Sequence, residues 1–195
     1  MKEGFKEAFE RFKFLRLADL VALFGLSSLK SFEKGELIAE AGTYCEHAFL
    51  IRKGIIRTYV LTPEGDERTI RFAKEKEFTS CGASFLRGEP ATEYLQAMED
   101  VKVVAINTRK LNKLTEENIR LLKLSHEGLK EAMAEAIKRI EFFTIHTPED
   151  RYKILMTESP ELLQRIPQKY LASYLGITTV SLSRIRSRVL SGENH

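Results

Sequence analysis

Apolar residues recur at two different spacings along the chain, and the changes of spacing divide it into regions. In residues 5–24 they recur every three or four positions, which predicts one or two short helices. In residues 29–106 short apolar and β-branched runs alternate with turn signals, a pattern typical of an antiparallel sandwich or barrel. The turn signals are Lys34-Gly35, Ala41-Gly42, Lys53-Gly54 and Pro63-Glu64-Gly65-Asp66.

A helical pattern returns at about Leu111, and from Ile119 to Phe143 it fits a heptad. Two sets of residues recur every seventh position, with the interleaved steps of three and four that a two-helix seam requires. The first set is Ile119, His126, Met133 and Ile140, and the second is Leu122, Leu129, Ala136 and Phe143. The stripe predicts one long dimerisation helix.

Two points about this stripe stay open at the level of sequence. The stripe could pack against the chain's own β domain instead of a second subunit, and both arrangements could hold. Leu121, Leu124 and Ile137 lie off the stripe and are candidates to cover the sheet. His126 within the seam could fix the register or sense pH, or it could be an ordinary solvated or hydrogen-bonded histidine.

The segment Thr147-Pro148-Glu149-Asp150 is typical of a helix start. Thr147 is expected as the N-cap, Pro148 as the first helical residue and Asp150 as the partner in a capping box. This helix is expected to reach about Glu158, before a turn at Ser159-Pro160. We therefore divide the chain into a β domain over residues 1–110, a dimerisation helix over 111–146 and a C-terminal domain over 147–195, with a hinge at the second boundary.

Residues 166–189 carry the pattern of a helix-turn-helix. Pro167 suits the first turn of a helix, and Gly176 permits the left-handed conformation that ends it. Thr178 can then cap a second helix. The expected inner faces are Leu171, Ala172 and Leu175 in the first helix and Leu182, Ile185 and Val189 in the second, with Ile177 in the turn.

The outward face of the second helix predicts contacts with duplex DNA. Hydroxyl side chains and arginines dominate it, and no Asp or Glu occurs from Gln164 to Leu190. Arginine can bond both acceptors of a guanine edge, hydroxyls can fix phosphates, and Val180 can touch a thymine methyl. The alternative is a solvated arginine-rich helix. The candidate DNA-binding residues are Gln168, Lys169, Thr178, Thr179, Val180, Ser181, Ser183, Arg184, Arg186 and Arg188.

Composition adds a few exclusions. The hydrophobic fraction of 43% and charged fraction of 30% are those of an ordinary globular protein, and the net charge of +3 identifies no partner. Apolar runs fall far short of the ~20 residues of a membrane span, and no signal-peptide core opens the chain, so we expect a cytoplasmic protein without a membrane partner. Cys45 and Cys81 are too few for a disulfide framework or a four-thiolate cluster, and we interpret them as buried thiols.

The β region, heptad helix and helix-turn-helix, in that order, resemble the cyclic-AMP receptor and fumarate–nitrate regulator (Crp/Fnr) family across almost the whole chain. The resemblance is closest over residues 166–188, and in the β domain it rests on the glycine turns, Phe78 and Phe85-Leu86-Arg87-Gly88. It implies an α+β fold: an N-terminal β-roll like a cyclic-nucleotide-binding jelly roll with flanking helices, a long dimerisation helix and a C-terminal helix-turn-helix domain.

The resemblance also implies partners. Members of the family are homodimers that read two half-sites about 34 Å apart on double-stranded DNA, and RNA polymerase is a further expected partner. By position, Thr179, Val180 and Arg184 fall where members contact bases. Val180 departs from the glutamate often found there, so no consensus site is transferred. Only residues 190–195 follow the second helix, and we expect the β-hairpin wing of many members to be absent or vestigial.

The resemblance identifies a sensor site whose key residues are missing. In cyclic-nucleotide-binding members a Gly-Glu pair opens a short helix whose amides cradle the phosphate, and an Arg-Ser pair neutralises it. Aligned on Phe78, Phe85 and Gly88, this chain has Ser80-Cys81 and Ala91-Thr92 instead, with Glu89 and Glu93 close by. A carboxylate repels a phosphate, so cyclic AMP and cyclic GMP are disfavoured. The residues of this degenerate pocket are Arg71, Ser80, Cys81, Gly82, Ala91 and Thr92.

Other cofactors are disfavoured as well, and none is expected. The N-terminal cysteine cluster of oxygen-sensing members is missing, and haem would need axial ligands, whereas His47, the single histidine of the β region, is expected in a loop. A different effector, or a pocket that senses nothing, stays open.

Two rival functions fit the sequence less well. A cupin-like metalloenzyme would need several histidine and carboxylate ligands within the barrel, and no catalytic constellation or metal site is found. A nucleotide-binding or small-ligand-binding regulatory module with a vestigial DNA domain would have intact phosphate-binding residues and no DNA-recognition helix. The sequence shows the reverse, so we expect a homodimeric transcription regulator acting on a palindromic site, and not an enzyme.

Overall fold

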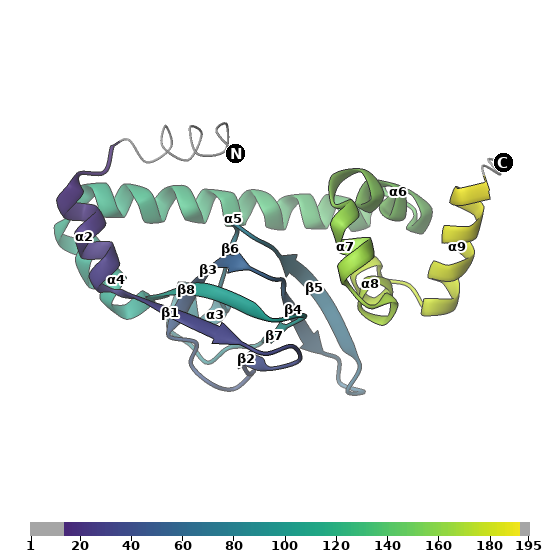
Figure 1. Cartoon of the computed structure of the whole chain (residues 1–195), viewed down its shortest axis with the longest axis horizontal. Coiled ribbons are helices and arrows are strands. Elements are labelled where there is room, and N and C mark those ends of the chain that lie inside the picture. The colour runs from purple at the N-terminus through teal and green to yellow at the C-terminus, as the bar shows by residue number, and fades with distance from the viewer. Residues whose placement is uncertain (1–13, 192–195) are drawn as a thin grey trace.

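The computed structural model describes residues 14–191, so the apolar positions Phe5, Phe9 and Phe12 lie outside the described residues. Within this range the chain folds into a β-roll, a long helix that runs along one side of it, and a group of short helices at the far end of that helix (Figure 1). The predicted α+β class and the predicted order of its parts are confirmed.

The strands of the described chain form two antiparallel sheets. They are β1 (Ser27–Phe32), β2 (Leu37–Ala39), β3 (His47–Lys53), β4 (Ile56–Leu61), β5 (Glu67–Ala73), β6 (Phe78–Thr79), β7 (Tyr94–Ala97) and β8 (Val101–Asn107). One sheet has the order β1-β8-β3-β6, and the other has the order β2-β7-β4-β5. The four predicted turn signals fall at the connections between consecutive strands from β1 through β5, with Lys53 as the last residue of β3.

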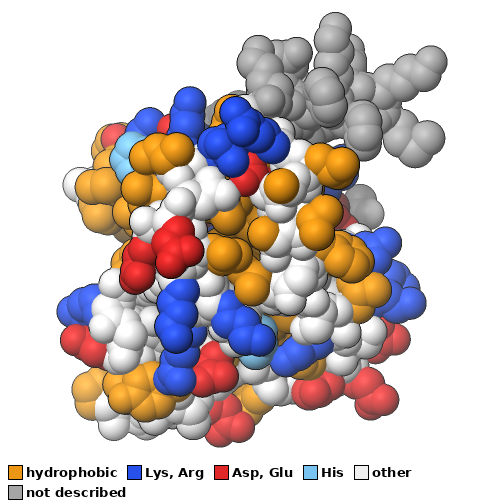
Figure 2. Space-filling view, turned by 90° about the vertical axis from the view of Figure 1, so that its left-hand side faces the viewer, with side chains coloured by type: hydrophobic (Ala, Val, Ile, Leu, Met, Phe, Trp, Pro, Cys, Tyr) orange, Lys and Arg blue, Asp and Glu red, His pale blue; other side chains and the backbone are white. Residues whose placement is uncertain are grey.

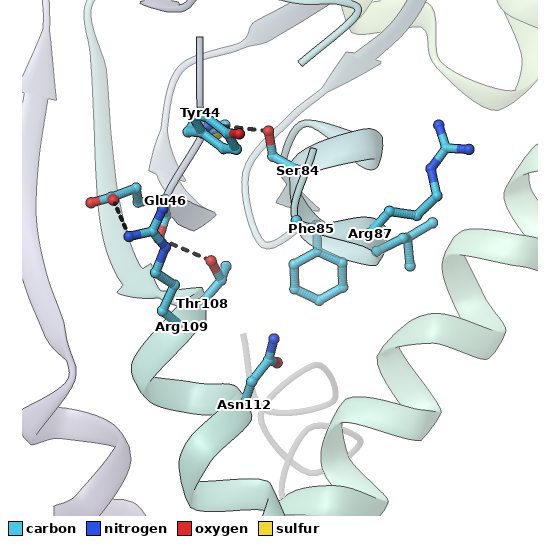
Figure 3. Close-up of a pocket in the computed structure, with 11 residues that line it drawn as sticks. Tyr44, Glu46, Ser84, Phe85, Arg87, Thr108, Arg109 and Asn112 are labelled. Carbon is cyan, nitrogen blue, oxygen red and sulfur yellow. Dashed lines mark hydrogen bonds and ion pairs between the residues drawn. The ribbon is translucent and has the colours of Figure 1, made fainter. Parts of the chain in front are cut away.

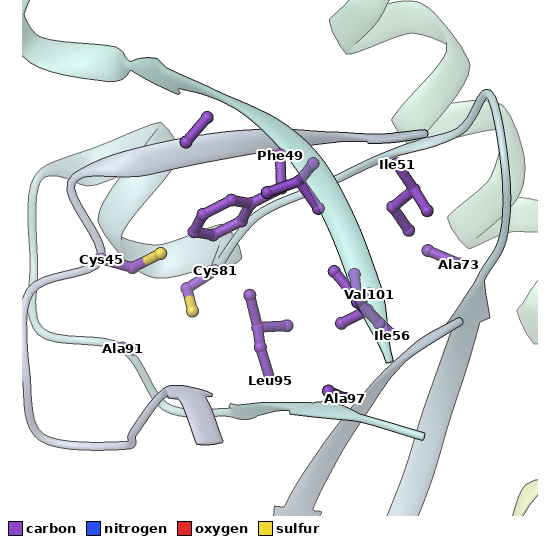
Figure 4. Close-up of a cluster of buried hydrophobic side chains, with 12 residues drawn as sticks. Cys45, Phe49, Ile51, Ile56, Ala73, Cys81, Ala91, Leu95, Ala97 and Val101 are labelled. Atoms are coloured by element: carbon purple, nitrogen blue, oxygen red, sulfur yellow. The ribbon is translucent and has the colours of Figure 1, made fainter. Parts of the chain in front are cut away.

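The two sheets enclose one apolar core, and β8 shows the alternation in burial that packing on one face of a sheet produces. In β8, Val101, Val103 and Ala105 are buried, while Lys102 between them is exposed. The opposite sheet contributes Ile56 and other apolar side chains to the same cluster (Figure 4). Cys45 and Cys81 belong to this core, which confirms that both thiols are buried.

Gly54 shows why one predicted turn needs glycine. Its φ is +94°, and a Cβ at this position would lie 2.8 Å from the carbonyl oxygen of Asp100. Both the backbone conformation and the close approach of β8 therefore exclude a larger residue.

The helices of the described chain flank or follow the β-roll. They are α2 (Leu17–Gly25), α3 (Gly82–Arg87), α4 (Thr108–Glu117), α5 (Ile119–Ile145), α6 (Pro148–Glu158), α7 (Pro160–Arg165), α8 (Gln168–Leu175) and α9 (Thr179–Ser191). Asp19 of α2 is buried and accepts hydrogen bonds from Asn118 at 2.7 Å and from Nε of Arg120 at 2.6 Å. These bonds hold the pKa of the Asp19 carboxyl well below its usual range and fix α2 to the start of α5.

The heptad stripe of α5 points away from the β-roll. Ile119, Met133 and Ile140 are 72%, 64% and 66% exposed, and the other five stripe residues are also exposed. Leu121 is fully buried and Leu124 is half-buried, as expected for positions that lie off the exposed stripe. The same prediction for Ile137 is wrong. Ile137 is 47% exposed because it lies one helical turn from both Met133 and Ile140, on their side of the helix.

The last four helices of the described chain begin with the predicted capping box. The Asp150 amide donates to the Thr147 hydroxyl at 3.2 Å, the Thr147 amide donates to the Asp150 carboxylate at 3.1 Å, and Pro148 is the first helical residue. The helix ends at Glu158, and the chain turns at Ser159 into α7.

These helices dock on the β-roll of their own chain, an arrangement that the sequence did not predict. Ile55, Phe72 and Met98 of the β-roll belong to the same buried cluster as residues of α6 to α9. The ring of Phe72 lies 5.3 Å from that of Tyr174 on α8. The hinge expected at Thr147 therefore joins two parts that share a core in this structure.

Polar contacts complete this docking interface. The Ser173 hydroxyl of α8 accepts from the Thr69 amide at 2.9 Å and donates to the Glu67 carbonyl at 3.0 Å, so it pairs with the open edge of β5. Arg139 of α5 donates to the carbonyl of Tyr174 at 2.6 Å. Burial lowers the pKa of Arg139 to about 10, well above neutral pH.

An arginine of α7 bridges two carboxylates of the β-roll. Arg165 bonds Glu75 at 2.7 Å and also bonds Glu99. The contact with Arg165 lowers the pKa of Glu75 to about 2. Because the pKa is lower in the folded state than its ordinary value of 4.5, this contact stabilises the fold above pH 4.5 and is lost as the pH falls toward 2.

Candidate nucleic-acid interface and sensor cassette

The helix-turn-helix is built as the sequence predicts. Leu171, Ala172 and Leu175 of α8 and Leu182 and Ile185 of α9 are buried, and Ile177 and Val189 pack partly buried against the same cluster. The Thr178 hydroxyl accepts from the Ser181 amide at 3.1 Å and so caps α9.

Gly176 ends α8 in the left-handed conformation, with φ +69°. A Cβ here would lie 2.8 Å from the ring of Phe143, so the turn also needs glycine for space. Phe143, predicted in the dimer seam, therefore contacts the helix-turn-helix as well. Arg139 and Arg151 stack on its ring at 4.4 and 4.7 Å, and 42% of the side chain stays exposed.

The predicted DNA-binding residues form an exposed surface on α9 and the start of α8. All ten are exposed except Ser181, which is half-buried and lies 3.0 Å from the Thr178 hydroxyl. A shallow depression on α9 is lined by Ser183, Arg184, Ser187 and Arg188. Ser187 was missed in the sequence, although its position three residues after Arg184 places it on the same side of the helix.

One carboxylate reaches this surface from a neighbouring helix. Arg188 lies 3.3 Å from Glu149 of α6, which also bonds Lys153 at 2.9 Å. Arg184 is exposed on α9 and forms no ion pair with another residue of the described part of the chain. The surface can therefore supply free arginine donors, hydroxyls and the Val180 methyl groups to a polyanion.

The structure brings most of the predicted sensor residues together around α3. An internal carboxylate, that of Glu93, accepts from the Gly82 amide at the start of α3, from the Thr92 amide at 3.2 Å and from the Thr92 hydroxyl at 2.8 Å. Glu93 is buried, with 9% of its surface exposed. The groups that would face a bound anion here therefore already bind an anion of the protein itself.

The other predicted pocket residues are engaged in local structure. The Ser80 hydroxyl donates to the His47 carbonyl at 3.0 Å, Cys81 precedes α3 and is fully buried, and the Ala91 amide donates to the Thr43 carbonyl at 2.8 Å. Arg71 is directed elsewhere: it donates to Glu135 of α5 at 2.5 Å and to the Phe78 carbonyl at 2.7 Å.

His47 is not a loop residue, contrary to the sequence prediction. It opens β3, is half-buried, and stacks on Phe49 with ring centroids 6.1 Å apart. Burial lowers the pKa of its imidazole, and the positive charge of Lys30 acts in the same direction.

A cavity of about 300 Å³ lies beside α3, and none of the six predicted pocket residues lines it (Figure 3). It is lined by Tyr44, Cys45, Glu46, Ser84, Phe85, Leu86, Arg87, Gly88, Thr108, Arg109 and Asn112. Arg109 and Glu46 pair across its wall at 3.2 Å. No local sequence signal marks this cavity, because its walls come from the loop before β3, from α3 and from α4.

Comparisons with known proteins agree with this architecture. Residues 29–118 match the family model of the cyclic nucleotide-binding domain. The chain is 24% identical over 176 residues to the fumarate and nitrate reduction regulatory protein of Vibrio cholerae, covering 84% of this chain and 69% of the relative.

Solved structures show the same fold. FixK2 from Bradyrhizobium japonicum superposes with a TM-score of 0.73 at 17% identity, covering 85% of each chain. A CRP/FNR-family transcriptional regulator from Thermus thermophilus gives a TM-score of 0.65 at 20% identity, covering 85% of this chain and 87% of that one. The fold and the site together define a cyclic-nucleotide-binding-type domain joined by a long helix to a helix-turn-helix. Residues 29–118 belong to the cyclic nucleotide-binding domain family, and the whole chain is similar in sequence and fold to regulators of the Crp/Fnr type.

The helices of residues 14–191 include none with the length and apolar character that crossing a bilayer requires.

Proposed function

We propose that the protein is a homodimeric transcription regulator that binds a two-fold palindromic DNA site without control by cyclic AMP. The observation that carries this proposal is the α9 surface, which is exposed, rich in arginine and hydroxyl groups, and held on a buried core by the caps at Thr178 and Gly176. A helix presented in this way fits the major groove, where arginine reads guanine and threonine and valine contact thymine.

The exposed stripe of α5 supports the homodimer. Its two sets of heptad residues run over residues 119–143, which is ~36 Å of helix. Hydrophobic side chains also gather on the face of the molecule where α2 lies, among them Leu17, Val21 and Phe24 (Figure 2). Apolar surface of this extent is expected to be covered in the working protein, and a second copy of α5 presents the matching stripe.

A symmetric dimer of this kind would present two copies of α9 to successive major grooves, about 34 Å apart. Its target would then be a palindrome with half-sites one helical turn apart. At a promoter, RNA polymerase is the further partner that such a regulator would contact.

The Glu93 carboxylate supports independence from cyclic nucleotides. It accepts the hydrogen bond of the Gly82 amide at the start of α3. Ala91 stands at the position where nucleotide-binding members of the family have the phosphate-binding arginine. A cyclic nucleotide would bring its phosphate against a buried carboxylate with no cation to compensate.

Selection of bound duplexes from a random DNA library, without added ligand, tests the main proposal. We expect enrichment of a two-fold palindrome, and anisotropy titrations of the enriched duplex should weaken steeply from about 50 to 200 mM salt because arginines displace counterions. A scrambled duplex of the same composition is the control. No enrichment by the folded dimer, or equal binding of the scrambled duplex, would contradict ligand-independent sequence-specific binding.

Thermal unfolding with cyclic AMP and cyclic GMP tests the second part. A ligand at 100 times its Kd stabilises a protein by about 2.7 kcal/mol, so specific binding raises the Tm measurably. We expect no change with either nucleotide at millimolar concentration, whereas the enriched duplex should raise the Tm in the same assay. A rise that depends on the concentration of cyclic nucleotide would overturn the assignment of Glu93.

A further inference from the structure

The only two cysteines of the sequence meet at one place in the fold. Cys45 lies in the loop before β3, and Cys81 lies at the start of α3. Both are free and buried, and their side chains lie close enough for each to shift the pKa of the other. Figure 4 shows the two sulfur atoms at one end of the apolar core, beside Phe49 and Leu95. Neither thiol has a role in the proposed DNA binding.

The backbones that carry the two thiols are already tied together on both sides. The Cys45 amide donates to the Ser84 hydroxyl of α3 at 3.1 Å. The Ser80 hydroxyl, next to Cys81, donates to the carbonyl of His47 at 3.0 Å, and the Cys45 sulfur lies 3.4 Å from that same carbonyl. These bonds hold the two cysteine-bearing segments side by side, and such proximity is the first geometric requirement for a disulfide.

The two thiols differ in acidity. The hydrogen bond from Cys81 lowers the pKa of Cys45 to about 6, whereas the same contact, burial and the nearby charge of Glu93 raise the pKa of Cys81. Cys45 is therefore the thiol of the pair that ionises more readily. A thiolate is the form of cysteine that attacks an oxidant.

The two thiols also differ in access. Cys45 lines the cavity of about 300 Å³ beside α3 and retains 7% of its surface exposure, whereas Cys81 is completely buried behind it. A small uncharged oxidant can therefore meet Cys45 first, and Cys81 stands where it can act on the product.

We propose that Cys45 and Cys81 form a redox-active dithiol that a small hydroperoxide oxidises to an intramolecular disulfide. The Cys45 sulfur attacks the peroxide oxygen and breaks the O–O bond, giving a sulfenic acid on Cys45 and releasing an alcohol, or water from hydrogen peroxide. The Cys81 sulfur then attacks the Cys45 sulfur, and the sulfenic hydroxyl leaves with the Cys81 proton as water. The pair loses two electrons, which reduce the peroxide bond.

Alkylation of the full-length protein before and after hydrogen peroxide tests this inference. After peroxide is removed, the protein is unfolded in N-ethylmaleimide and weighed by mass spectrometry. The untreated protein should carry two adducts, and the oxidised protein should carry none and be lighter by two hydrogens than the reduced chain. Dithiothreitol should restore both adducts. Tryptic peptides of the oxidised protein should contain the segments of Cys45 and Cys81 joined together.

Two serine variants separate the roles of the thiols. In Cys81→Ser, Cys45 should stop at the sulfenic acid, which dimedone captures. In Cys45→Ser, Cys81 should stay reduced and give one adduct before and after peroxide. Serine preserves size and hydrogen bonding, and the wild-type result stands alone if a variant does not fold.

Three results would overturn the dithiol. The wild-type protein could keep both adducts after peroxide, Cys45 could become a sulfinic acid while Cys81 stays free, or the disulfide could join two chains. DNA binding by the reduced protein does not depend on this chemistry, so failure here leaves the proposed function intact.

Discussion

Met133→Glu is expected to convert the protein from a dimer to a monomer. Its affinity for a palindromic duplex should fall as a result, because a monomer can bind only one half-site at a time. Met133 lies at the centre of the α5 stripe and is 64% exposed in the single chain, so the substitution costs the monomer little. In a parallel pair of α5 helices the two introduced carboxylates would face each other in an apolar seam. An uncompensated buried charge costs about 3–5 kcal/mol, enough to shift the dissociation constant more than a hundredfold.

Sedimentation equilibrium of the variant measures this shift directly. Ala134→Glu is the matched control, because Ala134 is exposed on the same helix one residue outside the heptad stripe and receives the same single carboxylate. The control should stay dimeric, and circular dichroism should show that both variants are folded. A Met133→Glu protein that remains a dimer would remove α5 as the dimer interface.

Arg184→Ala is expected to lower affinity for the selected palindrome by about 1–3 kcal/mol at each half-site and to relax base preference at one position. Arg184 is exposed at the middle of the α9 surface, beside Ser183 and Ser187. The reason is the loss of the two donors that an arginine offers to the acceptors of guanine. Binding to unrelated duplexes should fall less, because that binding depends on phosphate contacts spread over several residues.

Anisotropy titrations with the palindrome and with single-base variants of it measure both effects. Arg68→Ala is the control: it removes the same side chain from β5, where Arg68 is exposed and pairs only weakly with Asp66 at 3.4 Å. This variant should bind as the wild type does. Unchanged specific binding by Arg184→Ala would show that another face of the protein reads the bases.

The helix-turn-helix and the heptad helix were predictable because their signals are local. Gly176 and Thr178 set the turn through their own backbone conformation and capping bond, and both are confirmed. The stripe on α5 follows from spacing within one helix. The prediction for Ile137 was wrong because spacing alone does not show whether an apolar residue beside a stripe packs with the stripe or with the β domain. Ile137 lies one helical turn from both Met133 and Ile140, so it is exposed with them.

The docking interface and the cavity could not be predicted for the opposite reason. Ser173 meets Thr69 and Glu67 across more than a hundred residues of sequence, through a hydroxyl that binds backbone groups, and such a contact leaves no pattern in either segment. The hydrogen bond between Glu93 and Gly82 was predictable only in part. The sequence places the Glu93 carboxylate near the predicted phosphate-binding residues, and the structure shows that it accepts a hydrogen bond from the Gly82 amide.

The shared cluster of the β-roll and the last helices has a consequence for how the protein melts. Ile55, Phe72 and Met98 lose their apolar neighbours if α6 to α9 unfold, and Leu155 and Leu175 lose theirs if the sheet opens. Removing either partner would expose apolar surface on the other. The two halves of the chain are therefore one cooperative folding unit, and a substitution deep in the β-roll also weakens the helices that present α9.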